Sequence, residues 1–210
     1  RKAFILNKNM KVRMPTANRQ ELIAPIQYIS QGATPDEHLD NIKSALDSGV
    51  DWVQLRMKNY HEEVVYKTAL QVRNITLKYD ATFILNDYHM LVQHCDADGV
   101  HLGQNDETPR AARHILGEQY IIGVTANSLH DILGLINSGI NYIGLGPFRE
   151  TSTKTNLSPI LGLEGYQKIM NTLEGTSIKT PIVAIGGIQA EDIQELMQTG
   201  IRGIALSRYL

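Results

Sequence analysis

Two short apolar segments of this sequence are each followed directly by polar residues that include an aspartate. Residues 83–87 end in Asn86 and Asp87, and residues 99–106 end in Asp106. A short apolar run bounded by turn-forming residues is typical of a buried strand. The carboxyl ends of buried parallel strands face the crevice in which α/β proteins bind ligands. We therefore expect these three polar side chains to meet at one edge of a sheet.

Two carboxylates and an amide at one edge suit a hard cation such as Mg²⁺. In proteins this ion takes one or two carboxylates and completes its shell with water and substrate phosphate. Residues 90–95 lie between the two segments and are expected to form a helix of about two turns. The alternative interpretation is that Asp87 and Asp106 only cap loops.

The rest of the chain repeats this alternation of strand and helix. The predicted strands are 26–29, 52–55, 82–85, 99–102, 120–124, 142–145, 182–185 and 203–206, and the predicted helices are 35–48, 61–79, 90–95, 109–116, 128–138, 163–173 and 190–198. Regular alternation predicts a parallel sheet. Eight such strands in roughly 200 residues predict a single-domain α/β fold, a closed (β/α)₈ TIM barrel. A doubly wound open sheet is the alternative.

The two ends of the chain depart from this pattern. Residues 1–24 are mixed and basic without a clear period, and we expect them to form an arm or a short helix before a barrel domain of residues 25–210. The chain reaches Leu210 four residues after the last predicted strand, so an eighth helix is expected to be missing. We favour a lost or disordered tail over an arm that covers the gap.

Composition excludes several classes of partner. The 210 residues carry a formal net charge of −2, which argues against a general nucleic-acid or membrane partner. The single cysteine excludes an internal disulfide framework and fits a reducing compartment, so we expect a cytoplasmic protein. No apolar run reaches the roughly 18 residues that span a bilayer. Small molecules are therefore the expected partners, and a homo-oligomer stays open.

Cationic side chains follow the second predicted strand. Strand alternation places Gln54, Arg56 and Lys58 on one side of the chain. An arginine clamps phosphate with two donors, and a lysine acts as a point charge, so this set suits a polyanion. The alternative is an ordinary solvated loop.

Hydroxyl groups and glycines follow the later strands. Thr125 follows the fifth strand, and a long loop at 146–162 carries Thr151, Thr153 and Lys154. Loops longer than about 12 residues without their own structure are usually functional or disordered. A mobile loop is therefore the alternative to a phosphate-binding one. His101 lies inside the fourth strand, and we interpret it as a satisfied core residue outside the site.

A phosphate site is also predicted after the last two strands. Gly187 follows the seventh strand and Ser207 follows the eighth. Barrels commonly bind phosphate at this position, and glycine lets backbone N–H groups approach an anion. One mouth would thus hold a phosphate on one flank and a metal with a diphosphate on the other. This arrangement predicts an enzyme that joins a phosphorylated acceptor to a group carried on diphosphate.

From about Ile26 to Ser207 the chain resembles the thiamine-phosphate synthases. The motifs that carry the resemblance are Gln54-Leu55-Arg56-x-Lys58, Leu85-Asn86-Asp87, Asp98-Gly99-Val100-His101-Leu102-Gly103-Gln104-x-Asp106, Ile122-Gly123-Val124-Thr125, Gly144-x-Gly146-Pro147 with Thr151-x-Thr153-Lys154, and Ala184-Ile185-Gly186-Gly187-Ile188. The resemblance implies a transferase that uses Mg²⁺ to join a hydroxymethylpyrimidine diphosphate to a thiazole phosphate. It further implies that diphosphate leaves first and that the thiazole nitrogen attacks the resulting pyrimidinylmethyl cation.

The resemblance also implies a role for each site residue. Carried over by motif, the metal ligands are Asp87 and Asp106; the diphosphate ligands are Arg56, Lys58, Asn86 and Lys154; the pyrimidine neighbour is Gln54; and the thiazole phosphate ligands are Thr151, Thr153, Gly187 and Ser207. Arg56, Lys154 and Thr125 are the expected catalytic residues. The family usually has Ser at Thr125, so the added methyl group could shift the diphosphate. It often has His at Asn127, and the missing eighth helix would remove a helix N-terminus that helps hold phosphate.

Three other functions stay open at this point. A thiazole tautomerase shares the barrel but loses the Mg²⁺ and diphosphate residues, which are present here. A sugar-phosphate isomerase predicts a base and an acid at strand ends rather than two aspartates near two cations. A non-catalytic sensor of thiamine intermediates would bind ligand without turnover.

Overall fold

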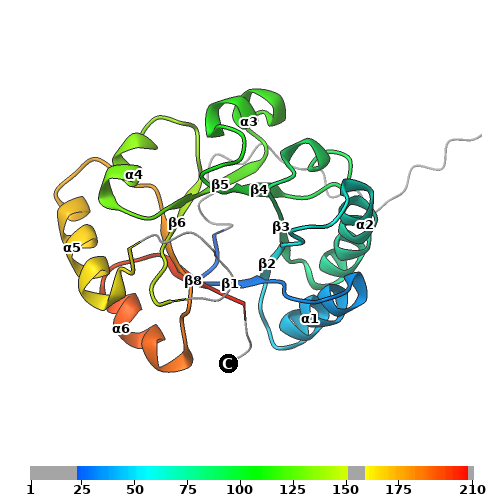
Figure 1. Cartoon of the computed structure of the whole chain (residues 1–210), viewed down its shortest axis with the longest axis horizontal. Helices are drawn as coiled ribbons and strands as arrows, with labels where there is room; N and C mark the ends of the chain where they lie inside the picture. Colours follow the sequence, from blue (N-terminus) through cyan, green and yellow to red (C-terminus); the bar gives the residue numbers. More distant parts are fainter. Residues whose placement is uncertain (1–22, 151–158, 208–210) are drawn as a thin grey trace, which may run out of the picture.

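Eight parallel strands form the centre of the molecule (Figure 1). The structure is a computed structural model and describes residues 23–150 and 159–207. The strands pair in sequence order, and the last pairs with the first, so the sheet closes on itself. The predicted (β/α)₈ barrel is confirmed, and the open doubly wound sheet is wrong. The strands are β1 (Ile26–Ile29), β2 (Trp52–Leu55), β3 (Thr82–Asn86), β4 (Gly99–Leu102), β5 (Ile121–Ala126), β6 (Tyr142–Leu145), β7 (Ile182–Ile185) and β8 (Gly203–Leu206).

Helices connect successive strands and surround the barrel (Figure 1). Those described are α1 (Pro35–Asp47), α2 (Glu62–Tyr79), η2 (His89–Leu91), α3 (Pro109–Leu116), α4 (Leu129–Gly134), α5 (Gly162–Glu174), η3 (Ala190–Asp192) and α6 (Ile193–Gln198). The bounds of α1, α2, α3 and α5 lie within one residue of those predicted. Within the described ranges, no helix combines the length and the apolar character needed to cross a membrane.

The connection between β3 and β4 forms less helix than predicted. A helix over residues 90–95 is wrong, because the chain forms only the 3₁₀ helix η2 and then a series of turns. Asp96 adopts a left-handed backbone with φ of 54°, which an α-helix does not contain. This residue lies one position beyond the predicted helix, and it ends the turns and directs the chain toward β4.

Two later helices are also shorter than predicted. The helix expected over 128–138 ends at Gly134, and Asn137 then adopts a left-handed backbone with φ of 61°. The helix expected over 190–198 divides into the 3₁₀ helix η3 and the short α6. Asp192 explains the division, because its carboxylate accepts the N–H of Gln189 at 2.8 Å and tightens the first turn.

Apolar side chains form three buried clusters. The first lies outside the barrel, and its buried residues come from the part of the chain between Tyr28 and Val124. The second draws its buried members from Ala126 to Leu206. The third fills the barrel interior and includes Trp52 and Tyr142, whose rings meet edge to face at 5.0 Å. The barrel is therefore a packed core with a functional surface only at its ends.

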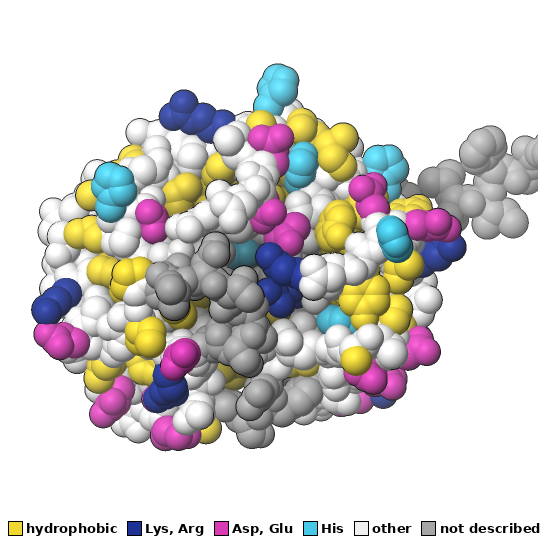
Figure 2. All heavy atoms as spheres, viewed as in Figure 1, with side chains coloured by type: hydrophobic (Ala, Val, Ile, Leu, Met, Phe, Trp, Pro, Cys, Tyr) yellow, Lys and Arg dark blue, Asp and Glu magenta, His cyan; other side chains and the backbone are white. Residues whose placement is uncertain are grey.

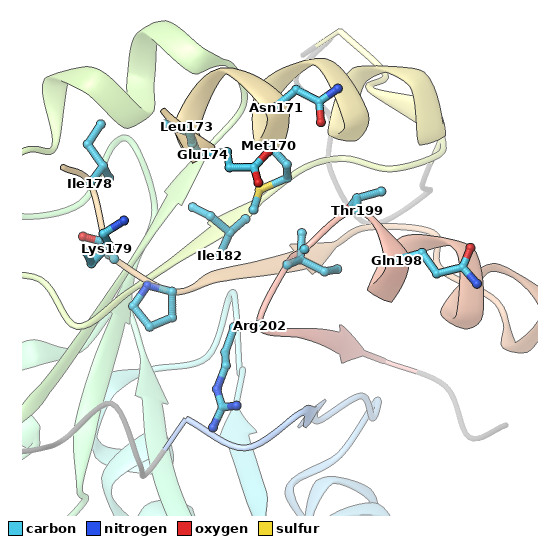
Figure 3. A pocket seen from close by; sticks show the side chains of 14 residues that line it. Met170, Asn171, Leu173, Glu174, Ile178, Lys179, Ile182, Gln198, Thr199 and Arg202 are labelled. Atoms are coloured by element: carbon cyan, nitrogen blue, oxygen red, sulfur yellow. The ribbon is translucent and has the colours of Figure 1, made fainter. Parts of the chain in front are cut away.

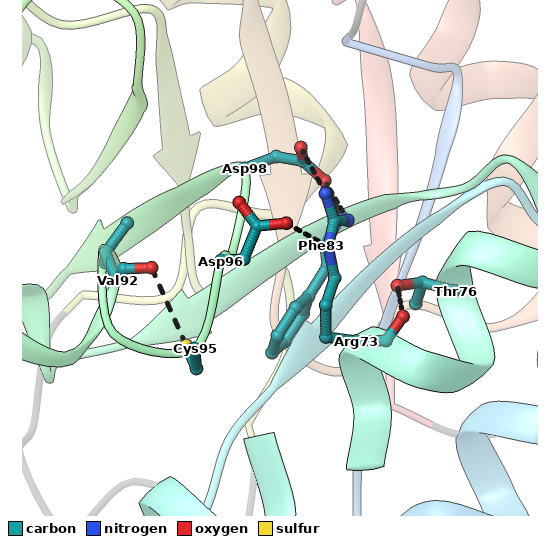
Figure 4. Close-up of polar contacts among 7 residues, drawn as sticks. All are labelled: Arg73, Thr76, Phe83, Val92, Cys95, Asp96 and Asp98. Carbon is teal, nitrogen blue, oxygen red and sulfur yellow. Dashed lines mark hydrogen bonds and ion pairs between the residues drawn. The ribbon is translucent and has the colours of Figure 1, made fainter. Parts of the chain in front are cut away.

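Ion pairs of a partly buried arginine hold the amino end of β4. Arg73 on α2 donates to Asp96 at 3.2 Å and to Asp98 at 3.1 Å (Figure 4). Asp98 also accepts the backbone N–H of Phe83 at 2.8 Å. Cys95, in the same view, is buried and contacts the carbonyl of Val92. These contacts fix β3 and β4 at the end opposite the candidate site.

Candidate active site

Asp87 leaves β3 through a tight turn. Its backbone is left-handed, with φ of 66°, a conformation that aspartate tolerates better than most residues. Its N–H donates to the carbonyl of His101 at 2.9 Å, and the N–H of Tyr88 donates to the carbonyl of Asn86 at 2.8 Å. The turn places the Asp87 carboxyl beyond the carboxyl end of β3 and beside β4.

Asp87, Asp106 and Lys58 meet there. The Asp87 carboxyl lies near that of Asp106, and the Lys58 Nζ lies 3.5 Å from an Asp87 oxygen. Burial, followed by the neighbouring Asp106 carboxyl, raises the pKa of Asp87 to about 6. Lys58 opposes this shift but does not cancel it, since its side chain is 47% exposed. The carboxyl pair therefore carries negative charge that a cation would stabilise.

The donor set fits Mg²⁺ better than a metal that needs a complete protein cage. Within the described ranges, no group of three or more His, Cys, Asp or Glu side chains could hold a metal ion. Asp106 is already oriented, because one of its oxygens accepts the N–H of Gly103 at 2.6 Å. Mg²⁺ accepts one or two carboxylates and leaves its other positions to water and phosphate oxygens. The role of Asp87 and Asp106 as metal ligands stays a prediction.

Arg56 extends the charged cluster toward β1. Its backbone N–H donates to Ser30 Oγ at 3.0 Å, and Ser30 Oγ lies 2.8 Å from His38 Nδ1. Burial lowers the pKa of Arg56, and the nearby Asp87 carboxylate opposes that effect. No described carboxylate forms an ion pair with Arg56, so its guanidinium retains donors for an anionic ligand.

The space-filling view agrees with this grouping. Lys or Arg side chains lie beside Asp or Glu side chains near the centre of the face in Figure 2. Opposite charges therefore meet near the centre of this face as well as around its edge. The arrangement can bind a metal and a polyanion together.

Glycines shape the other flank of the mouth. Gly186 and Gly187 follow β7 with φ of 88° and 72°, which other residues rarely adopt. A Cβ at Gly186 would lie 2.9 Å from Pro147, and one at Gly187 would lie 2.9 Å from Arg149. Ser207 directly follows β8 and is partly buried. Gly187 is exposed, and a glycine turn of this kind lets backbone N–H groups approach an anion.

An ion pair that we did not predict holds this flank. Arg149 makes two bonds to the Asp192 carboxylate, at 2.7 and 2.8 Å, and donates to the carbonyl of Gly187 at 2.8 Å. The N–H of Arg149 donates to the carbonyl of Gly186 at 3.0 Å. Arg149 thus joins the β6 connection to the glycine turn. An arginine in a polar loop gave no specific signal for this role in the sequence.

The structure turns Gln54 and Thr125 toward the barrel interior. Gln54 is 1% exposed and donates to Gln27 at 3.1 Å. Thr125 Oγ1 lies 3.0 Å from His101 Nε2. The buried Asn127 side chain donates to the carbonyl of Gly146 and joins the ends of β5 and β6. Thr151, Thr153 and Lys154 lie outside the described residues.

A separate groove of about 830 Å³ lies away from this mouth (Figure 3). The groove is lined by the segment that leads into the amino end of β7, by residues 198–202, and by Met170, Asn171, Leu173 and Glu174 of α5. The charged cluster lies at the carboxyl ends of the strands. The groove is therefore no part of the candidate active site.

Comparisons with known proteins agree on one family. A family model described as thiamine monophosphate synthase matches residues 26–210. A thiamine-phosphate synthase of Flavobacterium johnsoniae is 51% identical over 182 residues, which cover 87% of this chain and 86% of the relative. One from Caldicellulosiruptor saccharolyticus is 37% identical over 169 residues, covering 80% of this chain and 74% of the relative.

Solved structures extend this agreement. A thiamine phosphate pyrophosphorylase from Pyrococcus furiosus superposes with a TM-score of 0.77 at 30% identity, covering 90% of this chain and 88% of that one. An N-(5'-phosphoribosyl)anthranilate isomerase from the same organism superposes with a TM-score of 0.59 at 11% identity. The second likeness shows only a shared fold.

Proposed function

The chain belongs to the thiamine monophosphate synthase family, and from this premise we propose that it joins a hydroxymethylpyrimidine diphosphate to a thiazole phosphate. The products would be thiamine phosphate and pyrophosphate. The relatives are transferases of thiamine biosynthesis, and the chain is an enzyme of that class. The substrates, the metal and the residue roles that follow are our proposal.

One observation carries the proposal. Two cations, Arg56 and Lys58, lie at the same mouth as the paired carboxyls of Asp87 and Asp106. An isomerase of sugar phosphates needs an acid and a base but no such combination. A leaving diphosphate needs both the cations and a metal, because negative charge grows on it as the bond breaks.

The charged residues would act on that leaving group. Arg56, Lys58, Asn86 and Lys154 would hold the diphosphate oxygens. Asp87 and Asp106 would hold Mg²⁺, which when bound neutralises charge on the diphosphate.

The carbon–oxygen bond of the pyrimidinylmethyl group would break first, and its electron pair would leave with the diphosphate. The thiazole nitrogen would then form the new carbon–nitrogen bond.

The other side chains would position the two substrates around this step. Gln54 and Thr125 end the interior face of their strands and would contact the pyrimidine and its diphosphate. Gly187 and Ser207 would hold the phosphate of the thiazole with Thr151 and Thr153 of the β6 connection. The acceptor would thereby approach from the flank opposite the metal.

Release of pyrophosphate is the direct test. Protein shown to be folded by circular dichroism would be mixed with both substrates and Mg²⁺, and each of the three would be omitted in turn. We expect release only from the complete mixture. Lys58→Gln should reduce the rate by about 10²-fold or more, since it removes a donor to the leaving group. Lys67→Gln, which changes an exposed lysine paired with Glu63 on α2, is the matched control and should keep the rate.

A non-catalytic sensor predicts a different result. It would bind the substrates, as seen by calorimetry, and release no pyrophosphate from the complete mixture. Binding without release would refute the synthase proposal, and so would release that needs only one substrate.

A further inference from the structure

A continuous line of hydrogen bonds crosses the barrel interior and joins five strands. Gln54 Nε2 donates to Gln27 Oε1 at 3.1 Å, and Gln27 Nε2 donates to the Tyr142 hydroxyl at 3.4 Å. The Tyr142 hydroxyl lies 2.9 Å from His101 Nδ1. His101 Nε2 lies 3.0 Å from Thr125 Oγ1. The line therefore starts and ends at side chains that the proposed function places near substrate.

We infer the donors along this line from the direction of its first two bonds. Gln54 donates to the Gln27 oxygen, so the Gln27 nitrogen is the atom that meets Tyr142. The phenol oxygen accepts that bond, and its own proton is then directed to His101 Nδ1. Tyr142 keeps this proton, because complete burial raises the pKa of its phenol well above the ordinary value. In this arrangement His101 Nδ1 accepts from the phenol, and the Nε2–H donates to Thr125 Oγ1.

Thr125 completes the line at the mouth. Its oxygen accepts the His101 proton, so its own hydroxyl proton points away from the imidazole. Thr125 is the penultimate residue of β5 and lies close to the carboxyl ends of the strands. A hydroxyl held in this way presents a donor to an anion at the mouth.

We propose that His101 and Tyr142 are positioning residues that fix the Thr125 hydroxyl as a donor to the diphosphate. This inference rests on the proposed function for the identity of the ligand. It gives His101 a role that its place inside a strand did not suggest. Neither His101 nor Tyr142 needs to touch the reacting atoms.

The packing around the two rings holds them in one orientation. A Cβ at Gly123 would lie 2.1 Å from the Tyr142 ring, and one at Gly144 would lie 2.9 Å from the His101 ring. Glycine inside a strand is typical of such a close approach. Trp52 packs edge to face on Tyr142 at 5.0 Å, so the phenol has little freedom to turn. The glycines therefore make the space that this line of hydrogen bonds occupies.

The first experiment reads the proton positions in the free protein. Long-range ¹⁵N–¹H spectra of histidine side chains distinguish the Nε2–H tautomer from the Nδ1–H tautomer. The His101 signals would be assigned by their loss in His101→Gln or, if that variant does not fold, from the backbone assignment. We expect a neutral ring with its proton on Nε2. A spectrum that places a proton on Nδ1 would overturn the assignment.

The second experiment measures coupling between Tyr142 and Thr125. Binding of inorganic pyrophosphate with Mg²⁺ would be measured by calorimetry in Tyr142→Phe, Thr125→Val and the double variant. Thr125→Val should weaken binding about tenfold, since a hydrogen bond to a charged group is lost. Tyr142→Phe should weaken it about threefold or more when Thr125 is present and hardly at all in the Val background. Equal factors in both backgrounds, or no effect in either, would refute the proposal.

A matched control distinguishes the effect of breaking this line of hydrogen bonds from the effect of removing any buried tyrosine hydroxyl. Tyr166 is also fully buried, and its hydroxyl donates to the carbonyl of Leu145. Tyr166→Phe should change pyrophosphate affinity by less than about twofold, because the hydroxyl does not reach Thr125. If the unmodified protein released no pyrophosphate, that result would count against the proposed function and not against the positioning role. Proton placement and pyrophosphate binding would still test the positioning role.

Discussion

Replacing Asp87 by asparagine should stabilise the protein in the absence of metal while weakening its use of Mg²⁺. The Asp87 carboxyl is 23% exposed and lies against Asp106, so its negative charge is unfavourable in the folded state. Asparagine has nearly the same shape and no charge. The variant therefore removes the unfavourable charge together with the predicted metal ligand, and the two effects can be measured separately.

The size of the effect follows from the pKa. The carboxyl has an ordinary pKa of 3.8 and a folded pKa of about 6. At 1.36 kcal/mol per pKa unit, this difference corresponds to about 3 kcal/mol. Contact with water reduces it, and we expect about 1–2 kcal/mol. Because the folded pKa is the higher one, the cost is absent below about pH 4, grows as pH rises through about 6, and is fully present at about pH 7.

Urea unfolding across this pH range is the appropriate assay. In metal-free buffer, the unfolding free energy of the unmodified protein should fall between about pH 4 and pH 7 relative to that of Asp87→Asn. Added Mg²⁺ should stabilise the unmodified protein and leave the variant nearly unchanged. Asp51→Asn, at an exposed site before β2, is the control and should show the same pH dependence as the unmodified protein. Parallel curves for the unmodified protein and Asp87→Asn would refute the reasoning.

Three further predictions concern other parts of the barrel. Lys154→Ala should reduce kcat by about 10²-fold or more in the pyrophosphate assay while the circular dichroism spectrum is kept, because a donor to the leaving diphosphate is lost. Gly123→Ala should lower the unfolding free energy by about 1–3 kcal/mol in urea, because its Cβ would overlap the Tyr142 ring. Arg149→Gln should raise KM for thiazole phosphate more than it lowers kcat in steady-state kinetics, because it releases the glycine turn of the phosphate flank.

Each of these predictions has an outcome that contradicts it. An unchanged kcat in Lys154→Ala would remove that residue from the assigned role. Gly134→Ala is the packing control, since no described atom beyond its own stretch of helix lies within 4 Å of the added Cβ. Equal stability losses at Gly123 and Gly134 would exclude overlap as the cause. A fall in kcat with unchanged KM in Arg149→Gln would show that Arg149 acts on the reaction step rather than on phosphate binding.

The sequence predicted the barrel because local patterns repeat along it. Each strand is a short apolar run followed by a polar turn, and all eight runs form strands of the closed sheet. The helices after β3, β5 and β7 were predicted less well. Single residues such as Asp96, Asn137 and Asp192 redirect the backbone there, and their effect depends on local hydrogen bonds that periodicity does not contain.

The candidate site likewise has contacts that the sequence predicted and contacts that it did not. Strand ends alone predicted that Asp87 and Asp106 would be neighbours, because parallel strands finish at one edge. The partners of His101 could not be predicted, since they lie on β5 and β6 and depend on strand register. A signal was present in retrospect: Gly123 pairs in register with His101, and Gly144 lies against its ring. Glycines on neighbouring strands indicate that a large side chain fills the space between them.

The place of Trp52 has a consequence for how folding could be observed. It is the single tryptophan of the chain, and it lies in the interior cluster rather than in either outer one. In the part of the chain that the structure describes, its indole N–H is buried without a hydrogen-bond partner. Its fluorescence should therefore be blue-shifted only after the ring of strands has closed around it. Emission would time barrel closure, and far-ultraviolet circular dichroism would time helix formation, so that refolding of the two could be followed separately in one unlabelled sample.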